Sequence, residues 1–141
     1  MAKNNLSQWT LALLRVVLGI IFLYHGYAKL FVPGVFGGTV GFFAAINIPL
    51  PAYAALGVSV AEFLGGIFLL LGMVTKWTAA ILIIEMLVAF FKVHFKQGFF
   101  IAPQSYGYEF VLLILAALIV VLVNGAGKLA LGRMFRNKFL H

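Results

Sequence analysis

Six ionisable side chains lie inside long apolar stretches of this sequence. A charged side chain is costly in such a place, so these six are the first candidates for a chemical role. Three of them, Arg15, His25 and Lys29, belong to the apolar residues 14–31. At about 100° per residue on an α-helix, these three side chains fall within an arc of roughly 80°. A charged side chain in hydrocarbon costs several kcal/mol, so this helix face should turn toward protein or a polar cavity.

The possible partners of these bases are few, because the chain has only three acidic residues. Glu62, Glu85 and Glu109 each lie in a different apolar stretch. Counted along their predicted helices, His25, Lys29, Glu62 and Glu109 lie at a similar depth in the membrane. We therefore expect a polar cluster of these four residues. Arg15 and Glu85 lie in the other half of the bundle, and they are predicted to form a structural ion pair.

The predicted cluster of His25, Lys29, Glu62 and Glu109 suits a small polar headgroup such as a quinone. A histidine or lysine can donate a hydrogen bond to a carbonyl oxygen, and a carboxyl group can hold or deliver a proton. The same residues equally suit a set of ion pairs that only hold helices in register. Both interpretations remain open from the sequence.

The composition indicates an integral membrane protein. Of the 141 residues, 65% are hydrophobic and 9% are charged, whereas soluble domains are roughly 45–50% apolar and about 25% charged. We predict an all-α integral membrane four-helix bundle, a single transmembrane domain with spans at about 9–31, 53–74, 77–95 and 106–123. Residues 32–52 contain too many prolines and glycines to span, so they should form a short interfacial or re-entrant helix over the mouth of the bundle.

Several cofactors and partners are disfavoured by the residue types. The chain has no cysteine, which excludes thiol relays and iron–sulfur clusters on cysteine ligands. A metal site is not expected, because a single histidine stands beside carboxylates on separate helices. Haem ligation by His25 and His94 is disfavoured, since His94 lies between Lys92 and Lys96 in an interfacial pattern. The net charge of +7 fits anionic lipid headgroups rather than nucleic acid.

The distribution of lysine and arginine predicts the orientation. An even number of spans puts both termini on one side, and cytoplasmic segments carry the excess of these bases. The side of the termini would hold Lys3, Lys76, Lys128, Arg133, Arg136 and Lys138, and the other side Lys29, Lys92 and Lys96. We therefore expect an N-in, C-in protein whose residues 124–141 form a basic tail, with Lys128, Arg133, Arg136 and Lys138 facing the lipid of the inner leaflet.

Small residues at helical spacing indicate close helix packing. Gly57, Ala61 and Gly65 recur every four residues in the second predicted span. Such a ridge lets another backbone approach closely, either within the bundle or in a homo-oligomer.

Taken in order, these features resemble those of the DoxX family of small bacterial membrane proteins. The resemblance covers about residues 10 to 130. It rests on an early Arg15, on His25-Gly26-x-x-Lys29-Leu30, on Glu62-x-x-Gly65-Gly66 before Leu70-Leu71-Gly72, and on Gly107-x-Glu109 before Gly125-x-Gly127. The aspartate that usually follows the last span in this family is not seen here, where Lys128 leads into the basic tail.

The resemblance implies a multi-pass protein of the bacterial cytoplasmic (inner) membrane. Members of the family are linked to quinone-dependent redox systems such as thiosulfate:quinone oxidoreductase. This protein would then be the membrane component of such a system, with redox partner proteins supplying electrons. No self-contained catalytic or cofactor motif is present, so the sequence leaves open whether the chain is itself an enzyme. The alternative is a non-enzymatic carrier of small molecules or lipids, or a membrane anchor for partner proteins.

Overall fold

The computed structural model describes residues 5–132, and these residues form an all-α protein with one small hairpin. The helices are α1 (Asn5–Phe31), α2 (Val35–Ala45), α3 (Pro51–Leu71), α4 (Thr75–Ala89) and α5 (Glu109–Asn124). α4 continues into a π-helical turn, η1 (Phe90–His94), and a 3₁₀ turn, η2 (Phe95–Gln97). The hairpin pairs β1 (Ile101–Ala102) with β2 (Ser105–Tyr106) in antiparallel register.

Three of the described helices, Asn5–Phe31, Pro51–Leu71 and Thr75–Gln97, are long and apolar enough to cross a membrane. α5 is equally apolar but shorter, because the hairpin takes up the residues before Glu109. α2 is the short helix expected between the first two spans. It begins at Val35, two residues after Pro33.

Local residue choices explain where α3 begins and ends. Pro51 stands at its first turn, where the missing amide proton is no loss. Gly72 ends the helix in the left-handed conformation with φ 68°, which a glycine adopts without the steric cost of a Cβ atom. The chain then turns directly into α4 at Thr75.

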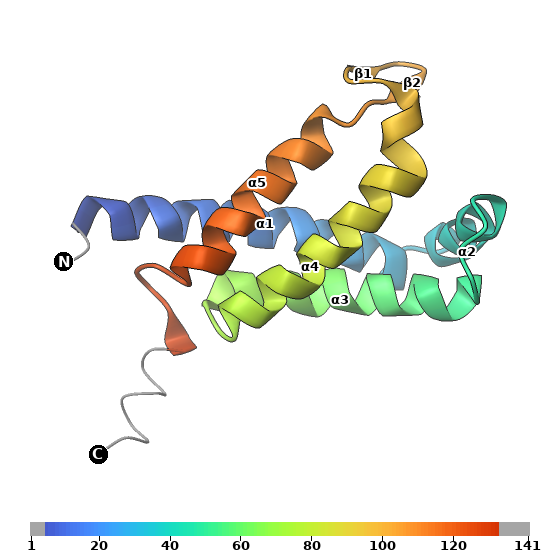
Figure 1. Cartoon of the computed structure of the whole chain (residues 1–141). Helices are drawn as coiled ribbons and strands as arrows, with labels where there is room; N and C mark the ends of the chain where they lie inside the picture. Colours follow the sequence, from blue (N-terminus) through green and yellow to red (C-terminus); the bar gives the residue numbers. More distant parts are fainter. Residues whose placement is uncertain (1–4, 133–141) are drawn as a thin grey trace.

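The helices form two crossing pairs (Figure 1). α1 and α3 lie side by side along most of their length, and α4 and α5 run diagonally across them toward the hairpin. The core lies where the pairs cross and is built from apolar side chains of all four helices: Leu11, Leu18, Phe22, Leu69, Ala79, Leu82, Ile114, Leu118 and Val121.

Glycines set the distance between α1 and α3. A Cβ atom built on Gly26 would stand 2.2 Å from the backbone nitrogen of Phe63, and one built on Gly66 would stand 2.4 Å from that of Leu23. Such distances leave no room for any side chain, so the two backbones touch at these positions. The predicted ridge is placed differently: a Cβ atom on Gly57 would meet nothing within 4 Å, and one on Gly65 would contact side chains of α4.

The beginning of α1 and the residues after α5 lie together at one end of the bundle. The backbone amide of Lys128 donates to the carbonyl of Gln8, at 3.1 Å, and that of Gly132 donates to Gly72, at 3.4 Å. The first and last described segments therefore meet beside the α3–α4 turn, whereas α2 and the hairpin lie away from it (Figure 1).

Candidate functional site

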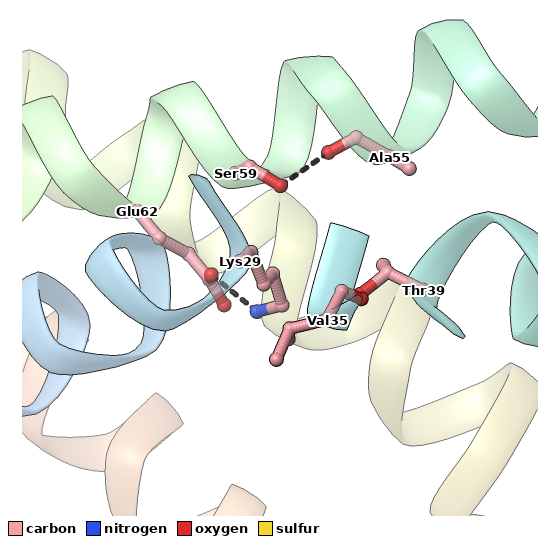
Figure 2. Close-up of polar contacts among 6 residues, drawn as sticks. All are labelled: Lys29, Val35, Thr39, Ala55, Ser59 and Glu62. Atoms are coloured by element: carbon pink, nitrogen blue, oxygen red, sulfur yellow. Dashed lines mark hydrogen bonds and ion pairs between the residues drawn. The ribbon is translucent and has the colours of Figure 1, made fainter. Parts of the chain in front are cut away.

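The centre of the candidate site is an ion pair between Lys29 of α1 and Glu62 of α3 (Figure 2). The lysine side chain is 18% exposed and the glutamate side chain 6% exposed. Ser59, one turn before Glu62, is fully buried and donates its hydroxyl to the carbonyl of Ala55 at 2.6 Å. Ser59 thus satisfies its own polar group within α3 and leaves Glu62 to Lys29.

The glycine contact between α1 and α3 places this pair. Gly26 lies one turn before Lys29, and the residue that it touches, Phe63, follows Glu62 in α3. Because side chains at i and i+3 lie on the same face of a helix, Lys29 is presented to α3 at the point of closest approach. The close packing of the two helices is therefore what brings the ammonium and the carboxylate together.

A second carboxyl group, that of Glu85 in α4, lies against Glu62 and near the Lys29 ammonium. Its Oε2 atom is buried and has no hydrogen-bond partner within residues 5–132. One ammonium cannot neutralise two carboxylates, so a neutral cluster requires one added proton. The three side chains together form a group that can hold a proton in an apolar setting.

Glu85 is the site residue that the sequence interpretation assigned elsewhere, although a signal for it exists. Glu62 lies eleven residues before Met73, and Glu85 lies twelve residues after it. Two antiparallel helices joined by a tight turn bring positions at equal distances from the turn to the same level. The GMVT turn between the two helices therefore indicates that the two glutamates share a depth.

A cavity of about 450 Å³, the α3–α4 cavity, opens beside the cluster. Lys29, Glu62 and Glu85 line it, with Lys92 from η1. Its walls are otherwise apolar, and small residues of α3 leave the space free: Ala54, Gly57 and Ala61. Phe43 of α2 and Ile46 and Ile48 of the following loop also line it. The short helix thus contributes an apolar part of the wall of a cavity that also has charged groups at its wall.

A smaller cavity of about 230 Å³, the His25 cavity, lies on the other side of Glu62. His25 of α1 and His94 of η1 line it together with apolar residues of α5. His25 and Glu62 therefore line the same cavity, but His25 does not line the α3–α4 cavity.

Glu109 does not join the cluster. Its Oε1 atom accepts a hydrogen bond from the backbone amide of Ile101, at 2.8 Å, at an exposed position, and it lines neither cavity. The hairpin displaces the start of α5 from the level of Glu62, so the first residue of α5 closes the hairpin instead. The prediction that placed Glu109 beside His25 is corrected accordingly.

The predicted ion pair between Arg15 and Glu85 is not formed. The Arg15 side chain is 1% exposed and donates to four backbone carbonyl oxygens, those of Leu69, Leu70, Lys128 and Leu129. The C-terminal end of a helix carries about half a negative charge in its free carbonyl groups. The end of α3 therefore partly balances the charge of the guanidinium, and Arg15 joins that helix to the segment after α5.

Of the four basic residues named for the predicted tail, Lys128 is the one that lies within the described residues. Its ammonium lies 5.8 Å from the centroid of the Trp9 ring, a cation–π arrangement at the end where both described termini meet. Arg133, Arg136 and Lys138 lie outside the described residues.

Comparison with known proteins identifies related sequences. The DoxX family model matches residues 10–95. An uncharacterized protein of Haemophilus influenzae is 34% identical over 141 residues, covering 96% of this chain and 99% of that protein. A Bacillus subtilis protein named "Putative oxidoreductase CatD" is 33% identical over 119 residues, covering 84% of this chain and 81% of that protein. No solved structure matches.

Proposed function

Because this chain belongs to the DoxX family of membrane proteins, we propose that it is the membrane component of a quinone-linked oxidoreductase system. In this proposal the quinone headgroup binds in the α3–α4 cavity beside Lys29, Glu62 and Glu85. The name of the Bacillus subtilis relative, "Putative oxidoreductase CatD", supports the same class of function. The non-enzymatic alternative, a carrier of small apolar molecules, would use the same cavity without electron transfer.

The observation that carries the proposal is the combination of an apolar cavity with a charged wall. Its volume of about 450 Å³ lies within the roughly 300–1,000 Å³ of small-molecule sites, which are mostly apolar and have a few polar groups. A quinone headgroup is a flat apolar ring with two carbonyl oxygens. The Lys29 ammonium is a donor for one such oxygen, and the small residues of α3 leave space for the ring.

The residues of this chain would bind the headgroup and manage protons. A bound quinone supplies an acceptor for two electrons and two protons, and the electrons come from a redox partner protein. Lys29 orients a carbonyl oxygen by a charge-assisted hydrogen bond. The Glu62–Glu85 pair would hold a proton and would supply it to a quinone oxygen as negative charge develops there.

We further propose that α1, α3, α4 and α5 cross the bacterial inner membrane as a four-helix bundle with both termini in the cytoplasm. The meeting of α1 with the segment after α5 supports an even number of crossings. α5 has 16 residues and is about 24 Å long, against about 30 Å of hydrocarbon. Tyr106 and Tyr108, which precede it, suit the interface at its outer end.

The first prediction concerns a substitution that fills the α3–α4 cavity without changing a charged residue. Gly57→Leu should lower the affinity for a short-chain ubiquinone about tenfold or more, because the new side chain enters free space that the ring would occupy. Titration calorimetry on the purified protein in detergent measures this affinity. Gly37→Leu on α2 is the matched control, since a Cβ atom there also meets nothing within 4 Å but lies outside the cavity. Equal binding by the two variants would contradict the proposed site.

The second prediction concerns a substitution that removes the proposed hydrogen-bond donor. Lys29→Met should weaken binding of the same quinone by about tenfold to a hundredfold, since hydrogen bonds to charged groups contribute roughly 1.5–3 kcal/mol. Lys76→Met is the control, because Lys76 is exposed at the beginning of α4, lies outside the α3–α4 cavity and donates to the carbonyl of Val123. If both variants bind as the unchanged protein does, Lys29 has no part in recognition. Binding without any quinone-dependent electron transfer, tested with partner proteins present, would favour the carrier function.

A further inference from the structure

We propose that the His25 cavity is the path by which the Glu62–Glu85 pair exchanges protons with water. This inference deepens the proposed function, because it assigns the proton supply of the same site. In this arrangement the α3–α4 cavity receives the ligand and the His25 cavity carries protons. The observation behind it is that Glu62 lines both cavities, together with Met86 and Ala89.

The titratable groups around Glu62 divide between its two sides. Lys29 of α1 and Glu85 of α4 face it at the α3–α4 cavity. His25 of α1 and His94 of η1 line the cavity on the other side. Among the described residues that line the His25 cavity, these two histidines and Glu62 are the ionisable ones, and the remaining lining residues are apolar.

Imidazole suits proton transfer because it is the side chain that gains and loses a proton near neutral pH. The Nδ1 atom of His94 is hydrogen-bonded to the carbonyl oxygen of Tyr106. A carbonyl oxygen only accepts, so Nδ1 carries the hydrogen in this bond and Nε2 is left as an acceptor. His94 thus presents a basic nitrogen at the hairpin end of the bundle, at the point where α4 gives way to η1.

The volume of the cavity allows water between these groups. About 230 Å³ holds several water molecules, each of which takes about 30 Å³ in the liquid, provided that polar partners are present. His25, His94 and the Glu62 carboxylate are such partners. His25 is exposed and lines this cavity, so its ring is not packed into the core.

The proposed step moves one proton at a time and needs no oxidant. After the Glu62–Glu85 pair has given its proton to a ligand, the pair carries one more negative charge. A proton from water binds His94 Nε2, while the hydrogen on Nδ1 stays on that nitrogen and keeps its hydrogen bond to the carbonyl oxygen of Tyr106. The proton taken up by Nε2 then passes through cavity water and His25 to an oxygen of Glu62. This transfer restores the neutral cluster with Lys29. No covalent bond other than those to hydrogen is made or broken.

Infrared spectroscopy can measure this exchange without any quinone. The chain has only three acidic side chains, so the Glu109→Gln protein keeps Glu62 and Glu85 alone. In this background, transfer into deuterated water should shift the C=O band of the shared carboxylic acid as its proton is replaced. The rate of that shift, in protein reconstituted into lipid, reports proton access to the pair.

His25→Phe and His94→Phe should each slow the exchange at least about tenfold, because a proton-transferring side chain contributes factors of this size or more. His25→Gln tests proton transfer apart from plugging, since glutamine keeps a polar group but does not titrate; it should also slow the exchange. Gly37→Leu, on α2 and outside both cavities, should leave the rate unchanged. Because His25 is exposed, its variants should fold as the unchanged protein does. The midpoint of their unfolding checks this.

Two results would overturn the inference. Exchange at the unchanged rate in both phenylalanine variants would show that protons do not pass the histidines. Slower exchange in Gly57→Leu, without an effect of the histidine variants, would show that protons enter through the α3–α4 cavity instead. Because the measurement contains no quinone, a failure of quinone binding leaves its outcome unaffected, and the two proposals are tested separately.

Discussion

Replacing Gly26 with alanine is expected to destabilise the protein by about 3 kcal/mol or more and to abolish ligand binding in the α3–α4 cavity. The new methyl group would stand 2.2 Å from the backbone nitrogen of Phe63. Over-packing commonly costs about 1–3 kcal/mol when side chains can adjust. Here the obstacle is backbone, so α1 and α3 must move apart.

The effect on the site follows from the same movement. Gly26 lies one turn from Lys29, and Phe63 is the neighbour of Glu62. Separating the helices at this contact therefore separates the ammonium from the carboxylate. Gly66→Ala should act in the same way, because a Cβ atom there would stand 2.4 Å from the backbone of Leu23.

Unfolding by SDS titration in detergent micelles measures the loss, and quinone titration measures the effect on the site. Gly37→Ala is the control, since its Cβ atom meets nothing within 4 Å. It should be neutral or slightly stabilising, because alanine is favoured over glycine in a helix by up to about 1 kcal/mol. If Gly26→Ala and Gly37→Ala unfold at the same SDS fraction, the close approach of α1 and α3 does not hold in the protein.

Arg15→Leu is expected to lower the free energy of unfolding by about 3 kcal/mol or more. The guanidinium donates to four carbonyl oxygens, and leucine leaves all four without that donor. An unsatisfied buried polar group costs roughly 1–3 kcal/mol. The segment after α5 should detach first, because Arg15 holds Leu129 in its left-handed conformation with φ 54°.

Arg15→Lys should lie between the leucine variant and the unchanged protein. An ammonium keeps the positive charge near the end of α3, but it lacks the planar fork that reaches two segments at once. Gly72 supports this arrangement, since a Cβ atom there would stand 2.7 Å from an Arg15 nitrogen. SDS titration gives the order of stability, and limited proteolysis gives the release of the C-terminal segment. Lys76→Met should change neither, and equal stability of Arg15→Leu and Lys76→Met would refute the joining role of Arg15.

The sequence by itself determined the class of protein, because hydrophobicity and the scarcity of charge are properties of composition that no packing can reverse. It also determined the family and the helical nature of its long apolar segments. The pairing of Lys29 with Glu62 was accessible as well. A membrane protein with ten bases and three acids offers few ways to neutralise a charge within a span.

The sequence placed Glu62 and Glu85 at similar distances from the GMVT turn, but only the tertiary structure decided that Glu85, and not Glu109, completes the site. Periodicity gives the face and depth of a residue on its own helix, but not the angle at which a neighbouring helix crosses it. The crossing of the α4–α5 pair over α1 and α3 brings Glu85 to Glu62, and the hairpin keeps Glu109 away. Arg15 illustrates the same limit, because its partners are backbone carbonyls, which every residue possesses and which no sequence pattern can therefore single out.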